Sequence, residues 1–209
     1  MAEILLDVQS AASTPSAGQA VLAVNTTTKR LQTVDDTGFR RTLGYVNFST
    51  TSQAPAASTR TYIAGTNIVI PAGALQVGTR FRWTFTATKT GAGTATSTVD
   101  IAFGTAGTTA DTARVSFTKP AGTGVIDEAF FTIEAIVRGP VGASGVVVGT
   151  MQMTHNLAAT GHAVIPCVNV TTVSAAFEIT TPINIGVCIT TGSLDVITIQ
   201  LATAECWNV

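Results

Sequence analysis

Apolar and polar residues alternate with a period of two along most of this chain, and helical periodicity is nearly absent. The clearest run is RFRWTFTATKT at 80–90, in which Phe81, Trp83 and Phe85 share one face while arginines and threonines occupy the other. The next run, STVDIAFG at 97–104, alternates in the same way. We expect these two strands to pair as an antiparallel hairpin across the glycine-rich loop between them.

Further runs of strand length follow, each bounded by turn-forming residues. They lie at 126–138, 145–154, 163–170, 175–180, 184–190 and 194–204. In the last of these, Ile197, Ile199 and Leu201 are expected to point inward, with Thr198 and Gln200 outward. The number and length of the runs predict an all-β protein whose body is an antiparallel sandwich of two sheets.

Two apolar residues of the run 126–138 lie on its otherwise polar face. Phe130 and Ile136 alternate there with threonine, glutamate and arginine. Either a loop of the same chain or a neighbouring subunit would cover this second face, and the sequence favours neither. Trp207 has a similar ambiguity, because it could anchor a subunit contact or close the end of the sandwich.

The front of the chain differs from the rest in composition. Residues 1–44 hold eight of the 23 charged residues, which marks a boundary. Within this part QAVLAV and KRLQTV are expected to pair across NTTT, and DDTG offers a turn. We therefore predict an N-terminal arm with a β-hairpin at 1–48, a linker at 49–59 and the sandwich at 60–209. A lone two-stranded hairpin is marginal in water, so the arm is expected to gain stability by docking on another surface.

Charge and cysteine content exclude several classes of function. Only 11% of the residues are charged, against about 25% in typical proteins, and the formal net charge is -1. The sequence therefore predicts neither nucleic acid nor a membrane as a partner, and it shows no secretion signal. The three cysteines, Cys167, Cys188 and Cys206, lack the spacing of a zinc site or a disulfide framework and are expected to be buried thiols.

No catalytic or metal constellation can be assembled from the sequence. His155 and His162 flank the loop HNLAATGH without a carboxylate in that loop, so solvated loop histidines are the preferred interpretation over a metal site. The neighbours Asp127 and Glu128 point to opposite faces of an extended chain and cannot act as an acid and base pair. Glycine-rich loops such as GTAGTTAD lack the strand-to-helix context of a phosphate site. We expect a protein that is not an enzyme and that has no cofactor.

Four stretches resemble structural proteins of tailed bacteriophages. These are TPSAGQAVLAVNTTTKRLQTVDDTGFRRTLG, TNIVIPAGALQVGTRFRWTFTATKTG, IEAIVRGPVGASGVVVGTM and SLDVITIQLATAE. The resemblance is to capsid decoration (cement) proteins, head fibres and short tail fibres, and it implies a jelly-roll-like sandwich that forms a homotrimer on the virion. A long fibre would need a shaft between arm and sandwich, where this chain has only a short linker, so a compact appendage is favoured.

The resemblance implies that the arm attaches to the major capsid protein or another virion protein, while the sandwich trimerises. The residues expected to dock are Leu22, Val24, Lys29, Arg30, Leu31, Asp35, Asp36, Arg40 and Arg41. Those expected at the trimer interface are Phe130, Ile136 and Trp207. The implied location is the virion, with the capsid surface favoured over the tail, after synthesis in the host cytoplasm.

Two other functions remain open at this point. In the first, the chain is a short fibre or receptor-binding module whose outer loops, at 91–97, 105–112 and 155–162, contact a host glycan or protein. The second is a polysaccharide depolymerase, which is poorly supported because no carboxylate pair or triad is evident.

Overall fold

The computed structural model contains two separately packed units. The described residues are 16–18, 20–24, 31–35, 40–42, 45–90, 93–142, 145–174 and 180–207. One unit comprises residues 1–45 with Val209, and the other, called the body below, comprises residues 46–208. Within the described residues there is no helix long and apolar enough to cross a membrane.

The described part of the N-terminal unit is a small antiparallel sheet of β1 (Ala20–Val24), β2 (Leu31–Asp35) and β3 (Arg40–Thr42). Val24 pairs with Leu31 and Ala20 with Asp35, so the hairpin predicted from QAVLAV and KRLQTV is confirmed. The third strand, β3, pairs with β2 and was not predicted. The expected turns at NTTT and DDTG lie largely outside the described residues.

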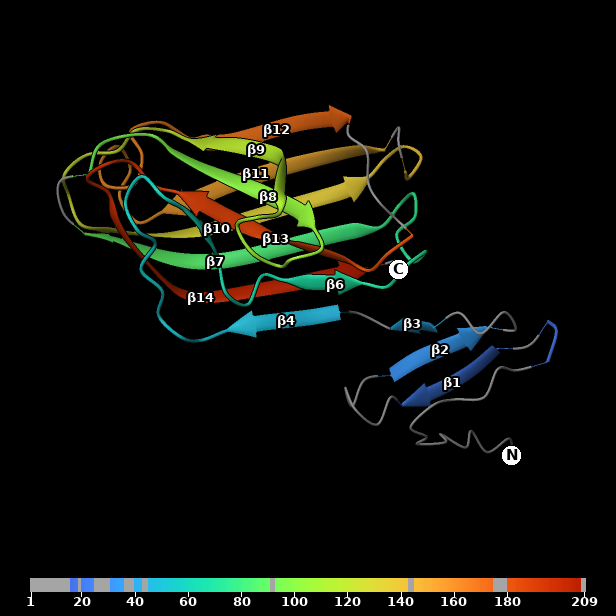
Figure 1. The fold of residues 1–209 in the computed structure, drawn as a ribbon. Coiled ribbons are helices and arrows are strands. Elements are labelled where there is room, and N and C mark those ends of the chain that lie inside the picture. Colours follow the sequence, from blue (N-terminus) through green and yellow to red (C-terminus); the bar gives the residue numbers. More distant parts are fainter. Residues whose placement is uncertain are drawn as a thin grey trace. The chain divides into compact units, whose positions relative to one another are not determined.

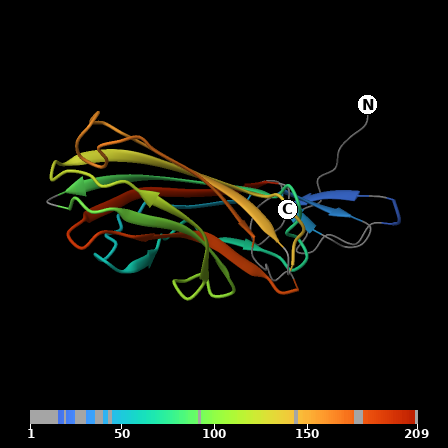
Figure 2. The same cartoon turned by 90° about the horizontal axis from the view of Figure 1, so that it is seen from above.

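The body is a sandwich of two antiparallel sheets (Figures 1 and 2). The six-stranded sheet runs β12-β11-β10-β7-β14-β4, with the bounds β4 (Tyr45–Ser49), β7 (Arg80–Thr90), β10 (Asp127–Val137), β11 (Val146–His155), β12 (Cys167–Ser174) and β14 (Val196–Trp207). The second sheet runs β5-β13-β8-β9, and β6 also pairs with β13; its strands are β5 (Arg60–Tyr62), β6 (Ile68–Ile70), β8 (Ser97–Gly104), β9 (Thr112–Lys119) and β13 (Ile183–Thr190).

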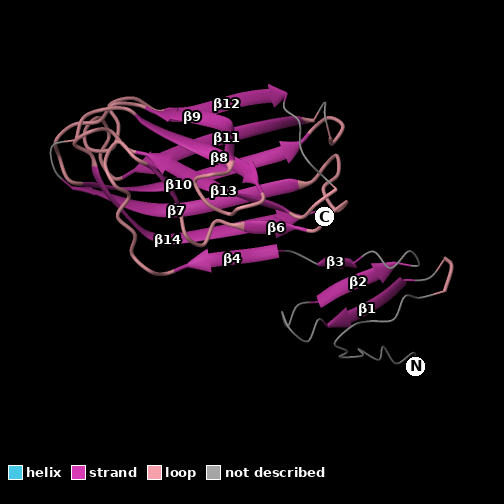
Figure 3. Ribbon diagram, viewed as in Figure 1, coloured by secondary structure: helices cyan, strands magenta, loops and turns pink. Residues whose placement is uncertain are grey.

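The strand order identifies the body as jelly-roll-like. The order β4-β14-β7-β10 faces the order β6-β13-β8-β9, and the chain crosses repeatedly between the two sheets. The strands β11 and β12 form an additional hairpin that extends the first sheet beside β10. Figure 3 shows the strands joined by loops at both ends of the body. The all-β fold class and the two-sheet sandwich expected from the sequence are confirmed.

One predicted pairing is wrong. β7 and β8 do not form a hairpin, because β7 lies between β10 and β14 whereas β8 lies between β13 and β9. The chain crosses from one sheet to the other between them, so that their apolar faces contribute to the same core from opposite sides. Alternation along a strand shows which face is buried, but it does not show which strand is the neighbour.

The core is built around aromatic residues of β7 and β10. Trp83 is fully buried, and its Nε1–H donates a hydrogen bond to the Thr66 carbonyl at 2.8 Å. The rings of Phe85 and Phe131 stack with centroids 4.5 Å apart. Gly149 of β11 allows close approach of the other sheet, because a Cβ at this position would lie 2.7 Å from a methyl carbon of Val115.

β14 contains a register shift that corrects another prediction. Ile199 pairs with Ala87, but Leu201 pairs with Thr86, so Gln200 is the extra residue of a β-bulge. Ile197 and Ile199 point inward as predicted, whereas Leu201 is 40% exposed on the outer face. The strand therefore changes the phase of its alternation at Gln200.

The segment 49–59 lies against the body. Gln53 and Ile199 exchange two backbone hydrogen bonds of 2.8 Å, and the Ser58 N–H donates to the Thr191 carbonyl. Pro55 is buried. This segment, expected to be a linker with almost nothing to bury, thus continues along β14 beyond the end of β4.

The cysteines have the environment expected from the sequence. Cys167, Cys188 and Cys206 are buried and free. Burial raises the pKa of the Cys188 and Cys206 thiols to about 12, so both remain protonated and unreactive at neutral pH.

Candidate functional site

The outer face of the six-stranded sheet combines exposed apolar residues with a polar, threonine-rich surface. The register places side chains in rows across this face. One row, at the end where β10 begins, consists of Thr154, Phe130, Thr86 and Leu201. Another row, at the opposite end of β10, consists of Val148, Ile136, Arg80 and Trp207. Six residues separate Phe130 from Ile136 along β10, which corresponds to about 20 Å.

An arginine and glutamate cluster lies at the Ile136 end of the face. Arg80 Nη2 is 2.9 Å from Glu134 Oε2, and Arg82 Nε is 3.7 Å from Glu134 Oε1. The Arg80 guanidinium also lies 5.9 Å from the centre of the Trp207 ring, a cation-π distance. Arg80 and Arg82 are therefore both held at the Ile136 end of this face.

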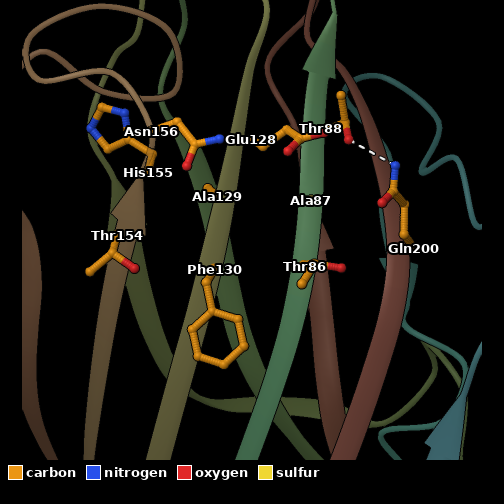
Figure 4. Close-up of a pocket in the computed structure, with 10 residues that line it drawn as sticks. All are labelled: Thr86, Ala87, Thr88, Glu128, Ala129, Phe130, Thr154, His155, Asn156 and Gln200. Carbon is orange, nitrogen blue, oxygen red and sulfur yellow. Dashed lines mark hydrogen bonds between the residues drawn. The ribbon is translucent and has the colours of Figure 1, made fainter.

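A shallow hollow of about 310 Å³ lies at the other end of the face (Figure 4). We call it the sheet hollow, and it is lined by Thr86, Ala87, Thr88, Glu128, Ala129, Phe130, Thr154, His155, Asn156 and Gln200. In Figure 4 the polar side chains of Asn156, Glu128, Thr88 and Gln200 follow one another across the sheet, from the end of β11 over β10 and β7 to β14, while the Phe130 ring lies apart from them along β10. Gln200 Nε2 donates to Thr88 Oγ1 at 2.9 Å, which holds one side of the hollow.

Asp127 lies on the core side of β10 and supports this end of the sheet. Its Oδ2 accepts hydrogen bonds from His155 Nδ1 at 2.7 Å and from the His162 N–H at 3.0 Å, and its Oδ1 accepts one from the Glu128 N–H. Burial alone would raise the pKa of Asp127, but these hydrogen bonds outweigh it and lower the pKa. The ionised Asp127 carboxylate accepts a hydrogen bond from His155 Nδ1–H, and this bond fixes the position of the imidazole ring beside the hollow.

His162 lies directly beneath the floor of the sheet hollow. Its ring is fully buried and contacts the Phe131 ring edge-on at a centroid distance of 6.2 Å, and Nε2–H donates to the Ala87 carbonyl at 3.1 Å. Burial lowers its pKa to about 4. The prediction of a solvated loop histidine is therefore wrong for His162, because the loop 156–166 folds onto the body.

The turn at Gly161 makes this folding back of the loop feasible. Gly161 has a φ of 80°, in the left-handed region, and a Cβ there would lie 2.3 Å from Asp127 Oδ2. Its N–H donates to Thr123 Oγ1 at 2.7 Å. The glycine thus brings the next residue, His162, within reach of the Asp127 carboxylate.

We expect the pH dependence of stability to report on His162. The folded state keeps the ring neutral with a pKa of about 4, whereas the unfolded chain takes up a proton near the ordinary pKa of about 6.5, so stability falls as the pH decreases from about 6.5 towards 4. The loss attributable to His162 is about 2–3 kcal/mol at pH 4.5. Urea denaturation at pH 7.5 and 4.5 should show a smaller loss in His162→Gln than in the natural chain, and equal losses would contradict this assignment.

The carboxylates near the hollow do not form a candidate metal site. The described residues contain no group of three or more His, Cys, Asp or Glu side chains that could hold a metal ion. Asp127 is buried while Glu128 is exposed, so the prediction that these neighbouring carboxylates face opposite sides of the sheet is confirmed.

The residues predicted to dock on a capsid fall on all three strands of the N-terminal unit. Leu22 and Val24 belong to β1, Leu31 and Asp35 to β2, and Arg40 and Arg41 to β3. Lys29, Arg30 and Asp36 lie outside the described residues.

The residues predicted at a subunit interface are exposed on the outer face. Phe130 is 43%, Ile136 41% and Trp207 40% exposed. The described parts of the chain therefore leave the two outward apolar residues of β10 partly uncovered. This outcome disfavours the first of the two alternatives, cover by a loop of the same chain.

The sequence did not indicate the sheet hollow. Its lining comes from β7, β10, β11 and β14 and from the residue after β11, so it depends on strand order and on the bulge at Gln200. One available signal was the aromatic Phe130 at an outward position, which was interpreted only as a residue covered by a loop of the same chain or by a neighbouring subunit.

Comparison with known proteins gives no family. No family model matches the chain, and no curated protein matches it. Among solved structures, the chain is similar to the CBM2 module of an evolved Dit from Lactobacillus casei BL23 phage J-1, with 8% identity, a TM-score of 0.28, and 68% of this chain and 69% of that chain covered. It is also similar to a mutant of the alginate lyase Aly36B in complex with alginate trisaccharide, with 10% identity, a TM-score of 0.32, and 92% and 88% covered.

A third similarity is to the infectious bursal disease virus Gt strain, with 11% identity, a TM-score of 0.26, and 84% of this chain and 39% of that chain covered. Identities and TM-scores this low relate the chain to none of the three by function.

Proposed function

We propose that the chain is a structural protein of a bacteriophage virion, a homotrimeric capsid decoration protein that docks through its N-terminal unit and stabilises the shell. The observation that carries this proposal is the division into a small N-terminal sheet and a jelly-roll-like body whose outer face exposes apolar side chains. The resemblance of the chain to phage structural proteins supports the same function.

The body offers a continuous apolar area for contact with other copies. We call this area the apolar corner, and it consists of Ile136, Val148, Val168 and Val170 on β10, β11 and β12. Val168 and Val170 are largely exposed, and β12 ends the sheet without a further strand among the described residues. Exposed apolar area of this kind is typical of subunit interfaces. Three copies around a three-fold axis form a closed ring, so that no apolar surface is left to add further copies.

Three N-terminal units on one trimer would bind a shell together. Each unit would contribute the residues predicted for docking, among them Leu22, Leu31 and Arg40. Simultaneous binding raises the effective concentration of the second and third units, and ligands that bind only the assembled shell stabilise it by mass action.

Removal of residues 1–44 should separate the two parts of the function. The cut precedes β4 and leaves the whole body intact, so the truncated protein is expected to keep its trimeric mass in light scattering. In a co-sedimentation assay it should fail to bind phage capsids that lack the protein. Normal capsid binding by the truncated protein would contradict the proposed attachment.

Ile136→Asp tests the apolar corner. We expect this variant to fall from trimer to monomer in light scattering, because a carboxylate would be desolvated at the contact. Val69→Asp is the matched control, since Val69 is also 41% exposed but lies on β6 of the other sheet. A folded Ile136→Asp variant that keeps the trimeric mass would contradict this interface.

A further inference from the structure

The sheet hollow has the chemistry of a sugar site. A pyranose ring presents apolar C–H groups on its faces and hydroxyl groups around its edge, and each hydroxyl can both donate and accept a hydrogen bond. A matching site needs an accessible aromatic face beside several donors and acceptors. The hollow provides both, because Phe130 is partly exposed between Thr154 and Thr86, and the polar side chains of Glu128 and Asn156 lie further along the same face.

The polar groups of the hollow include donors and acceptors that the described residues leave unused. Among the described residues, the Glu128 carboxylate has no hydrogen bond or ion pair, and the same holds for the Asn156 amide group. Glu128 supplies acceptors only, Asn156 supplies both kinds, and the hydroxyl groups of Thr86 and Thr154 add donors and acceptors. In Figure 4 Asn156, which directly follows β11, lies next to Glu128 of β10.

The hollow is supported on the side turned towards the core. Asp127 fixes His155, and His162 holds the Ala87 carbonyl under the floor. On the opposite side, the Gln200–Thr88 hydrogen bond fixes the amide that the β-bulge brings to the hollow. His155 and Gln200 are therefore held in place before binding, and such side chains lose less conformational freedom when a ligand binds.

The charges of the hollow select among sugars. No Lys or Arg lines it, and its exposed charge is the Glu128 carboxylate. Arg80 and Arg82 are engaged with Glu134 near the other end of the face, about 20 Å away along β10. A uronate or a sialic acid would therefore meet a like charge without a cation to offset it, whereas a neutral hexose would not.

We propose that the sheet hollow binds a neutral hexopyranose unit of a glycan, with the apolar face of the sugar on Phe130 and its hydroxyl groups on Glu128 and Asn156. This site deepens the proposed function, on which it rests for its role, because an assembled particle would present several copies to one glycan-bearing surface. It also limits the subunit contact to the apolar corner and leaves Phe130 free.

Saturation-transfer NMR on the full-length protein tests the site directly. The probes are the methyl glycosides of glucose, galactose, mannose and N-acetylglucosamine, with glucuronate as the charged comparison. We expect at least one neutral glycoside to bind with millimolar affinity and glucuronate to give no signal. Absence of binding by all four neutral glycosides, or equally strong binding of glucuronate, would overturn the assignment.

Two variants locate the site. Phe130→Ala should weaken binding of that glycoside at least tenfold, whereas Val69→Ala, on β6 of the other sheet with almost equal exposure, should leave it unchanged. Equal binding by Phe130→Ala and the natural chain would overturn the proposal. So would loss of the trimeric mass in Phe130→Ala, since Phe130 would then belong to the subunit contact.

Measuring mass, capsid binding and glycoside binding on the same samples distinguishes failure of the sugar site from failure of the proposed function. If the protein is monomeric but binds the glycoside through Phe130, the trimeric assembly fails and the sugar site stands. If the protein is trimeric and binds capsids but none of the glycosides, the sugar site fails alone.

Discussion

Replacing Arg60 with methionine is expected to lower the free energy of unfolding by about 3–5 kcal/mol. Arg60 makes a two-pronged contact with Asp100, with Nη2 to Oδ1 at 2.6 Å and Nε to Oδ2 at 3.0 Å, and the Asp100 side chain is only 4% exposed. Its Nη1 also donates to the carbonyl oxygens of Thr109 and Asp111. The substitution would leave a buried carboxylate without its cation and release the loop 105–111 from β5.

Thermal unfolding measures this effect, with an expected decrease in Tm of about 6–20 °C for a body of this size. Arg80→Met is the matched control. It also removes an arginine that pairs with a carboxylate, but both partners are more exposed, so the expected loss is about 1 kcal/mol or less. Similar decreases in the two variants would show that burial of Asp100 does not determine the effect.

Trp83→Ala should destabilise the body by about 3–5 kcal/mol. The indole is fully buried, it stacks near Phe81 with centroids 5.6 Å apart, and its N–H satisfies the Thr66 carbonyl. Trp83→Phe separates packing from hydrogen bonding, because it keeps an aromatic ring and removes the donor. We expect this second variant to lose about 1–3 kcal/mol.

Urea denaturation gives both free energies. A Trp83→Phe variant as unstable as Trp83→Ala would show that the hydrogen bond to Thr66, and not the packed ring, dominates at this position. If neither variant differed from the natural chain, the assignment of Trp83 to the centre of the core would be wrong.

The alternation of side chains along single strands could be read from the sequence. Phe81, Trp83 and Phe85 are buried as expected, because a strand with one apolar face must turn that face inward. The hairpin of the N-terminal unit was also predictable, since two short apolar runs flank a polar turn. Both predictions depend on local pattern alone.

Pairing between distant strands could not be read in this way. β7 has neighbours from residues 127–137 and 196–207 rather than from the next strand, and nothing in its own alternation indicates them. The strand β9, with Val115 and Phe117 inward, was missed. Residues 105–112 were interpreted as an outer loop, and no strand was predicted in the residues that follow. In the structure the Asp111 carboxylate orders the turn before β9 by accepting hydrogen bonds from the N–H groups of Ala106 and Gly107.

The candidate site depends on the same long-range information. The sequence places Phe130 and Ile136 on the outward face of their strand but leaves open what covers them. In the structure both side chains are partly exposed. The buried Asp127 and His162 were not foreseen, because a carboxylate 35 positions earlier in the chain meets the histidine only after the loop folds back. No local motif records such a contact.

The extra residue in β14 also determines how volumes are matched inside the body. Beyond Gln200, the inward residues Ala202, Ala204 and Cys206 lie opposite Phe85, Trp83 and Phe81, so that small side chains face large ones. Without the bulge, Leu201, Thr203 and Glu205 would occupy those places, and a carboxylate would be forced against the aromatic rings. Deleting Gln200 itself would not cause this exchange, because Leu201 would then follow Ile199 directly and keep the outward side that it already has. The bulge thus absorbs one extra residue in the strand and keeps the large aromatic rings beside small side chains.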